Sequence, residues 1–91
     1  MRRVVLSEQV RGYVAALAPE PRRTLRAALD GLPDGRGDLL ALEENLAGFW
    51  RLRVGRHRVI IAYTETAIRC LFAEERRLVY EIFSALLHKG L

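Results

Sequence analysis

The stretch FWRLRVGRHRVIIAY, residues 49–63, decides the fold predicted for this chain. Apolar and polar residues alternate on both sides of Gly55-Arg56, which is typical of two antiparallel strands joined by a tight turn. Glycine at the first central position suits a two-residue type II′ turn. The predicted pairs are Val54 with His57, Arg53 with Arg58, Leu52 with Val59, Arg51 with Ile60, and Trp50 with Ile61.

This register divides the hairpin into two faces, because directly paired residues lie on the same side of a sheet. The core face is predicted to carry Trp50, Leu52, Val54, Val59, Ile61 and Tyr63, all covered by helices. The opposite face, called the arginine face below, carries Phe49, Arg51, Arg53, Arg58, Ile60 and Ala62. Like charges directly opposite each other destabilise a sheet, so some group should offset the repulsion between these arginines.

A third strand, residues 67–73, is predicted to extend the sheet through a tight turn at Thr64-Glu65. The predicted pairs are Ile61 with Ile68, Val59 with Cys70, and Ile60 with Arg69. Arg69 would then join the arginine face, and Ile68, Cys70 and Phe72 would join the core face. The four arginines, Arg51, Arg53, Arg58 and Arg69, are predicted to be exposed, and Leu52, Val59, Ile61 and Cys70 to be buried. Two interpretations of the arginine face stay open, an anion-binding site and a solvated outer face that happens to be basic.

The N-terminal third of the chain is predicted to be a short strand followed by two helices. Residues 4–6 form a short apolar run, and Ser7 can cap the helix that follows it. Apolar residues at helical spacing predict a helix that ends near Ala18 and a second one that starts at Pro21. Residues 7–32 are therefore predicted to form a helical hairpin.

The remaining segments complete an α+β fold. Residues 39–42 suit either a strand or a helical turn. Helical spacing returns from about Glu75 to Leu87, with His88 and Lys89 placed to complement the helix dipole. The predicted order is an N-terminal strand, a helical hairpin, an antiparallel sheet of three further strands and a C-terminal helix.

Composition is typical of one small globular domain over residues 1–91. The apolar fraction of 51% is enough for a core, and no apolar run approaches the roughly 20 residues of a membrane span. Cys70 is the single cysteine, so no internal disulfide can form. A reduced, cytoplasmic compartment is the expected location.

The chain is basic, with a formal net charge of +4, and fourteen of its fifteen basic residues are arginine. Guanidinium groups bind phosphate in a bidentate manner, so a polyanionic partner such as nucleic acid is one interpretation. A genome whose codon usage favours arginine over lysine is the other. Only the positions of the arginines can separate the two.

The block FWRLRVGRHRVIIAYTETAIRCLFAEERRLVYE, residues 49–81, resembles the RelE/ParE superfamily of bacterial type II toxin–antitoxin toxins. The similarity lies in an aromatic-Arg-Leu-Arg-Val-Gly motif, in the Arg-Val-Ile of the next strand and in Arg-Arg-x-Val-Tyr. The family fold has the same order of elements as the one predicted above. The resemblance favours the RelE-like branch, whose members cleave messenger RNA in the ribosome without a metal ion or other cofactor.

The resemblance also implies roles for individual residues. Arg58 would stabilise the charge of the transition state, and Arg51 and Arg53 would hold phosphates. Tyr80 would stack on a base or take part in proton transfer. Arg69, Arg76 and Arg77 are further candidate contacts to nucleic acid.

The implied partners are a cognate antitoxin and the ribosome with its messenger RNA. The antitoxin is expected to lay an extended or helical segment over the sheet or against the C-terminal helix, with acidic side chains near the arginines.

The general base is the missing part of this site. The best-studied RNases of the family carry lysine at one or both of the positions that correspond to Arg51 and Arg53. Arginine, by contrast, effectively cannot give up its proton. His57 is predicted to point to the core side beside Phe72, and Glu81 and His88 are the other candidate bases. An acidic Glu74-Glu75 also stands where the family has a further basic residue.

Two alternative functions therefore stay open. One is a ParE-like toxin that inhibits DNA gyrase by binding, without chemistry of its own. The other is a degenerate toxin that only binds its antitoxin.

Overall fold

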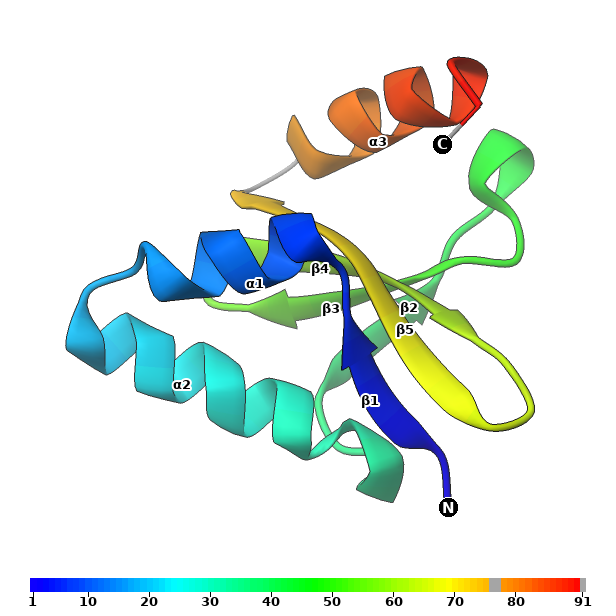
Figure 1. Ribbon diagram of the computed structural model, residues 1–91. Helices are drawn as coiled ribbons and strands as arrows, with labels where there is room; N and C mark the ends of the chain where they lie inside the picture. The colour runs from blue at the N-terminus through cyan, green and yellow to red at the C-terminus, as the bar shows by residue number, and fades with distance from the viewer. Residues whose placement is uncertain (76–77, 91) are drawn as a thin grey trace.

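A five-stranded sheet lies at the centre of the structure, as Figure 1 shows. The computed structural model describes residues 1–75 and 78–90. Within them the strands are β1 (Arg3–Leu6), β2 (Asp38–Ala41), β3 (Trp50–Val54), β4 (His57–Tyr63) and β5 (Ala67–Glu75), in the spatial order β1-β5-β4-β3-β2. The helices are α1 (Glu8–Ala15), α2 (Pro19–Asp30) and α3 (Leu78–His88), with short 3₁₀ helices η1 (Leu32–Asp34) and η2 (Glu44–Leu46).

The predicted α+β fold and its order of elements are confirmed, and the sheet is larger than predicted. β1 pairs with β5 in parallel, so the sheet is mixed. β2 pairs with β3 in antiparallel fashion, which makes residues 39–41 a strand. Leu39 pairs with Leu52 and packs against the core, so this apolar side chain stabilises the strand.

The helix ends differ from the predictions by two or three residues. The Ser7 hydroxyl caps α1 by accepting a hydrogen bond from the Val10 N–H at 3.1 Å, as predicted. α2 begins at Pro19. Proline fits the first turn of a helix, because an N–H at that position would have no acceptor within the helix. α3 begins after the predicted Glu75, because β5 continues through that residue. None of the described helices is long and apolar enough to cross a membrane.

The β3–β4 hairpin has the predicted register at all five pairs, from Val54–His57 to Trp50–Ile61. Gly55 has a φ of +61°, and Arg56 is not among the residues with positive φ. That combination is a type II′ turn, because a type I′ turn needs positive φ at both central residues. The prediction that Arg53 and Arg58 share one face is therefore confirmed.

The β4–β5 turn lies one residue later than predicted. Thr64 closes it, because its N–H donates to the Ala67 carbonyl at 2.9 Å and its hydroxyl accepts from the Ala67 N–H at 3.0 Å. Tyr63 therefore pairs with Ile68, and Ile61 pairs with Cys70. The predicted pairs were wrong by two positions, but the faces they assigned to Ile68, Cys70 and Arg69 hold.

A bulge in β5 then exchanges the faces of the residues that follow it. Ile61 pairs with Cys70 while Ile60 pairs with Phe72, so Leu71 is the extra residue. Phe72 and Glu74 consequently share a face with Ile60 and Arg58. The prediction that Phe72 belongs to the core face was wrong.

The two faces of the sheet carry separate cores. On the core face, α1 and α2 pack over Leu52, Val59 and Ile61. On the arginine face, α3 packs through an apolar group, called the α3 cluster below, of Leu46, Ile60, Phe72, Val79 and Phe83. Figure 1 accordingly shows α1 and α2 together on one side of the sheet and α3 apart from them.

Trp50 was predicted to lie in the core, and this prediction was wrong. Its side chain is 37% exposed, and it belongs to neither core. The ring makes an edge contact with Tyr63, with 5.8 Å between the ring centroids. Trp50 has the correct face but lies at the end of β3 away from the Gly55 turn, outside the cover of α1 and α2.

Gly37 fixes the backbone at the start of β2. It has a φ of +112°, and a Cβ built there would lie 2.8 Å from Cδ1 of the fully buried Leu52. We expect Gly37→Ala to lower the free energy of unfolding by about 2–4 kcal/mol, through backbone strain and overpacking together, as measured by urea denaturation.

Gly48→Ala is the matched control, because Gly48 has a φ of +97° but nothing within 4 Å of the built Cβ. It should cost only the strain, about 1–2 kcal/mol. Equal losses in the two variants would mean that the contact with Leu52 contributes nothing.

Candidate functional site

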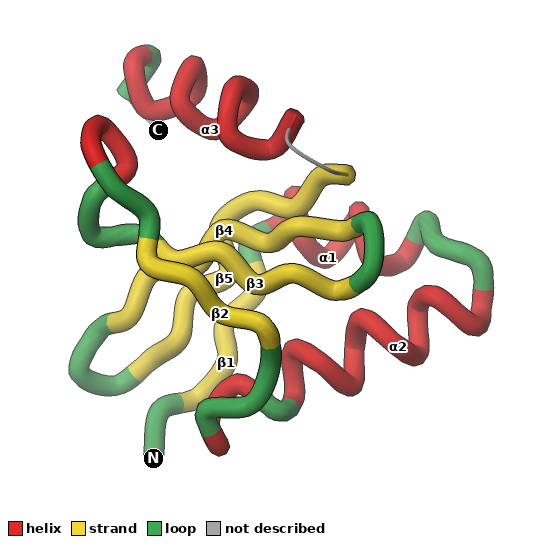
Figure 2. Tube along the Cα trace, turned by 180° about the vertical axis from the view of Figure 1, so that it is seen from behind, coloured by secondary structure: helices red, strands yellow, loops and turns green. Residues whose placement is uncertain are grey.

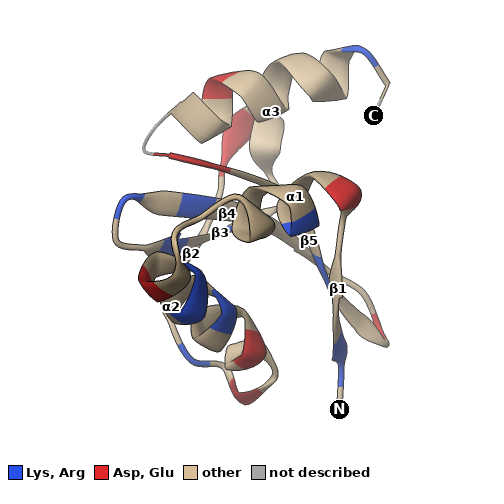
Figure 3. Cartoon of the chain, turned by 60° about the vertical axis from the view of Figure 1, so that its left-hand side comes forward, with Lys and Arg blue, Asp and Glu red and all other residues tan. Residues whose placement is uncertain are grey.

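Four arginines lie on the arginine face, as predicted from the hairpin. Arg53 and Arg58 are direct partners, and Arg51 pairs with Ile60. Arg69 pairs with Ala62, which places it on the same face further along the sheet. In Figure 3 the blue basic positions of β3 and β4 lie near their shared turn, close to the red acidic end of β5.

A carboxylate lies between the first two arginines, and sequence reasoning missed it. Asp38 pairs with Arg53 in the sheet register. Its Oδ1 accepts a hydrogen bond from Arg51 Nη2 at 2.9 Å, and its Oδ2 lies 3.7 Å from Arg53 Nε. Asp38 is therefore the group that offsets the repulsion between the arginines.

Arg51 is far more covered than Arg53, with only 13% of its side chain exposed against 53% for Arg53. The prediction that all four arginines are exposed holds for Arg53 and Arg69 and was wrong for Arg51 and Arg58, which are half-buried. Its Nε is buried and has no hydrogen-bond acceptor within residues 1–75 and 78–90. Buried N–H donors normally have a partner, so this atom marks a position where an acceptor would be favourable.

Arg58 rests on the backbone of its own turn. Its Nη1 donates to the carbonyl of Gly55 at 2.9 Å and to that of His57 at 3.2 Å. The other N–H donors of the guanidinium take no part in these two bonds and can serve a ligand. Glu74 is opposite Arg58 in the register, but its carboxylate accepts from the Glu75 N–H at 3.0 Å.

α3 brings Tyr80 to the arginine face. Tyr80 is half-buried and packs against the α3 cluster. That cluster includes Ile60, the direct partner of Arg51 in the sheet. Glu81 is exposed on the same helix, and the exposed His88 donates from Nδ1 to the Ser84 carbonyl at 2.9 Å. Arg76 and Arg77, predicted to contact nucleic acid, lie outside the described residues.

His57 lies on the core face, as predicted, but beside Tyr13 rather than Phe72. The Tyr13 hydroxyl and His57 Nδ1 are 2.6 Å apart, and the rings meet edge to face. Burial raises the pKa of Tyr13 to about 12, and the carboxylates of Glu75 and Glu74 add to the rise. Tyr13 therefore stays protonated at neutral pH and shares a hydrogen bond with His57, which ties α1 to the hairpin on the side away from the arginine face.

Cys70 is a core residue, as predicted, and not a nucleophile. It is 1% exposed, and burial raises the pKa of its thiol to about 12. A thiol protonated at neutral pH and closed off from solvent is inert.

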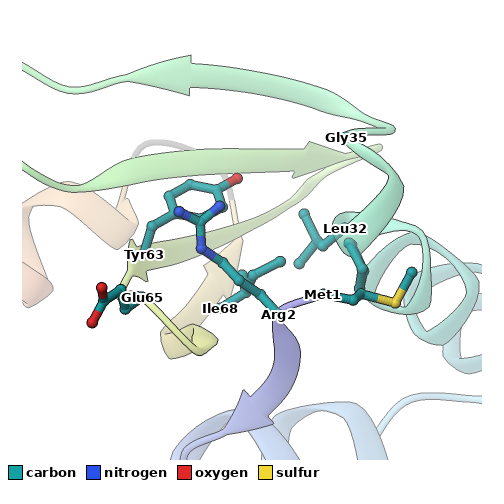
Figure 4. Close-up of a pocket in the computed structure, with 8 residues that line it drawn as sticks. Met1, Arg2, Leu32, Gly35, Tyr63, Glu65 and Ile68 are labelled. Carbon is teal, nitrogen blue, oxygen red and sulfur yellow. The ribbon is translucent and has the colours of Figure 1, made fainter.

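One pocket of the described residues lies away from the arginines. It has a volume of about 420 Å³ and is lined by Met1, Arg2, Leu32, Pro33, Gly35, Tyr63, Glu65 and Ile68 (Figure 4). Arg2 lies over the Tyr63 ring at 5.4 Å, and its Nε donates to the Thr64 carbonyl at 2.7 Å. These contacts fix the N-terminus to the β4–β5 turn, and Arg51, Arg53 and Arg58 take no part in them.

No family model and no curated protein matches this sequence. Solved structures do match. The toxin–antitoxin complex RelBE2 from Mycobacterium tuberculosis has a TM-score of 0.69 and 19% identity, covering 82% of this chain and 98% of that one. The chain has the fold of a RelE-type toxin. The archaeal RelE–RelB complex from Pyrococcus horikoshii gives a TM-score of 0.65 at 24% identity, with 84% and 96% of the two chains covered.

The RelE-type fold is also that of the YoeB dimer from Staphylococcus aureus. This structure has a TM-score of 0.65 and 17% identity, and covers 82% of this chain and 97% of that one. The predicted resemblance to the RelE/ParE superfamily is thus confirmed for the fold. RelE and YoeB structures match to a similar degree, so the fold does not assign the branch.

Sequence reasoning missed the polar contacts of two residues, Asp38 and Tyr13, for different reasons. Asp38 follows Gly35-Arg36-Gly37 and could be placed only once β2 was known to pair with β3. Tyr13 stands at a helical position between Val10 and Val14, where it is one more member of an apolar face. Neither position has a local pattern that indicates a polar contact.

Proposed function

We propose that this chain is the toxin of a type II toxin–antitoxin pair and that it cleaves messenger RNA on the ribosome. The observation that carries the proposal is the group of Arg51, Arg53 and Arg58 on one sheet face of a RelE-type fold. Guanidinium groups side by side on one face suit the phosphates of a single RNA strand, because each group can bind two phosphate oxygens.

The proposed reaction is attack of a ribose 2′-hydroxyl on the adjacent phosphate. The 2′-hydroxyl gives its proton to a base as its oxygen forms a bond to phosphorus, the bond from phosphorus to the 5′-oxygen breaks, and the leaving 5′-oxygen takes up a proton. Negative charge builds on the phosphoryl oxygens, so fixed cations stabilise the transition state. Arg58 supplies that charge with the donors left free by its turn contacts, and Arg51 and Arg53 hold phosphates.

Proton transfer is assigned to Tyr80 and to the target rather than to the arginines. Arginine keeps its proton, so it cannot act as a general base. Tyr80 packs against the α3 cluster on the arginine face, which supports a role in stacking on a base or in exchanging a proton. Alignment of the 2′-hydroxyl by the ribosome would supply the rest, since ideal positioning contributes roughly 7–11 kcal/mol.

The proposed partner in the resting cell is an antitoxin. Two of the matching structures described above are toxin–antitoxin or RelE–RelB complexes. The chain has a net charge of +4, and its arginine face is only partly covered by α3. An antitoxin segment with acidic side chains over Arg51, Arg53 and Arg58 fits this charge.

The proposal predicts cleavage that depends on the ribosome. We expect the purified protein to cut a message on programmed ribosomes and to leave the same RNA largely intact when it is free. Primer extension on both substrates measures this, and a parallel reaction contains DNA gyrase with supercoiled plasmid. Intact message together with trapped gyrase–DNA cleavage complexes would contradict the proposal.

Gyrase inhibition by binding is the second candidate, and one observation favours it. Within residues 1–75 and 78–90, no histidine or tyrosine side chain is hydrogen-bonded to Arg51, Arg53 or Arg58. A face with fixed charge and no proton donor in contact suits binding better than chemistry. The two parallel reactions above separate this candidate from the first, and loss of both would leave a degenerate toxin that binds only its antitoxin.

A further inference from the structure

Asp38 is the one carboxylate in ion-pair contact with Arg51 or Arg53 among the described residues. We propose that Asp38 is an internal counterion, which occupies the position of an RNA phosphate between Arg51 and Arg53 and limits how tightly the arginine face binds RNA. The naming of RNA as the ligand rests on the function proposed above. The competition between Asp38 and a phosphate for the two arginines applies to any phosphodiester strand.

The geometry supports a carboxylate standing in for a phosphate. Each oxygen of Asp38 faces a different arginine, Oδ1 to Arg51 Nη2 at 2.9 Å and Oδ2 to Arg53 Nε at 3.7 Å. A phosphate likewise presents several oxygens that can accept from guanidinium N–H groups. The donors that hold Asp38 are therefore the donors that a phosphate would use.

The position of the carboxylate is built into the backbone. Asp38 is the first residue of β2 and pairs with Arg53, so a short side chain is enough to reach both arginines. The preceding Gly37 has a φ of +112° and has no room for a side chain beside Leu52. This fixes the path of the chain into Asp38 and holds the carboxylate over the arginines.

The contact is also weak enough to be displaced. Asp38 and Arg53 each have more than half of their side chain exposed, and exposed ion pairs are screened by water and salt. Arg51 is largely covered, and Asp38 is hydrogen-bonded to it through Nη2 alone, at 2.9 Å. An RNA strand that binds several arginines together can thus displace Asp38, whereas a single phosphate competes poorly with it.

Removing the charge of Asp38 should strengthen RNA binding. The probe is a fluorescein-labelled, 2′-O-methyl single-stranded oligonucleotide, which cannot be cleaved, and fluorescence anisotropy measures its affinity. We expect Asp38→Asn to bind it on the order of fivefold to tenfold more tightly at low salt. The plot of log affinity against log salt should steepen by roughly 0.7, as for one additional phosphate contact to a single strand.

Asp34→Asn is the matched control. It makes the same change of side chain and charge in η1, where Asp34 is 3.9 Å from Arg36 and contacts neither Arg51 nor Arg53. Its affinity should stay within about twofold of the original chain, because its charge acts only through screened, long-range attraction. In an Arg51→Gln, Arg53→Gln background, Asp38→Asn should no longer increase the affinity.

Equal affinities of Asp38→Asn and Asp34→Asn would overturn the inference, and so would persistence of the gain without Arg51 and Arg53. If thermal unfolding shows that Asp38→Asn does not fold, Asp38→Ser makes the same test. The cleavage assay on ribosomes is independent of this one. Tighter binding by Asp38→Asn without any message cleavage would leave the inference standing and remove the proposed function.

Discussion

Arg58→Ala is expected to lower the rate of message cleavage on ribosomes about 100-fold or more. Loss of one group that stabilises transition-state charge has an effect of this size in other enzymes. Arg58 is the arginine of the second hairpin strand, directly opposite Arg53, and its guanidinium is held at the turn by two carbonyls. Single-turnover cleavage with saturating ribosomes measures the rate apart from binding.

Arg56→Ala is the control for charge at the same turn. Arg56 is the neighbour of Gly55 in the turn, and its Nη1 lies 3.9 Å from Glu75, whose side chain shares the core face with His57. We expect a change of about twofold or less, since an exposed charge acts weakly at a distance. A comparable loss in both variants would mean that net charge, rather than the placement of Arg58, governs the rate. Thermal unfolding of both variants would reveal any damage to the turn.

Phe83→Ala is expected to lower the free energy of unfolding by about 3–5 kcal/mol. Phe83 is fully buried and packs between Phe49, with 5.1 Å between ring centroids, and Phe72 at 6.4 Å. It is the largest fully buried side chain of α3. Urea denaturation followed by circular dichroism measures the loss.

Leu78→Ala tests whether the loss reflects packing rather than helix composition. Leu78 begins the same helix and is 53% exposed, so its removal should change the free energy of unfolding by no more than about 0.5 kcal/mol. If Phe83→Ala cost no more than Leu78→Ala, α3 would not be packed on the sheet in solution. Tyr80 would then lack a fixed position over the arginines.

The β3–β4 hairpin could be predicted residue by residue because every element of the pattern agrees. Alternation is clear from Trp50 to Val54, and glycine defines the turn type. Once the turn is placed, counting outward fixes which side chains share a face. The arginine face followed from the hairpin alone, before any helix was positioned.

The second half of β5 could not be predicted, because its sequence hides the bulge. Residues 70–73 read Cys-Leu-Phe-Ala, four apolar residues in a row, so no alternation reveals a change of face. Apolar cores on both sides of the sheet accept such a run in either register. The predicted core position of Trp50 was wrong for a related reason. A sequence pattern gives the face on which a residue lies, but not how far the helices extend over that face.

The bulge at Leu71 affects how this chain should be aligned with its relatives. The bulge adds one residue to β5. A gapless alignment with a chain that lacks the bulge therefore matches Glu74 to a residue on the opposite face of the sheet. Equivalent positions beyond residue 71 are those with the same β4 partner, such as Arg58 for Glu74 and Ile60 for Phe72. Insertions and deletions of one residue at this point then become the changes to compare between branches, because each would exchange what faces the arginines.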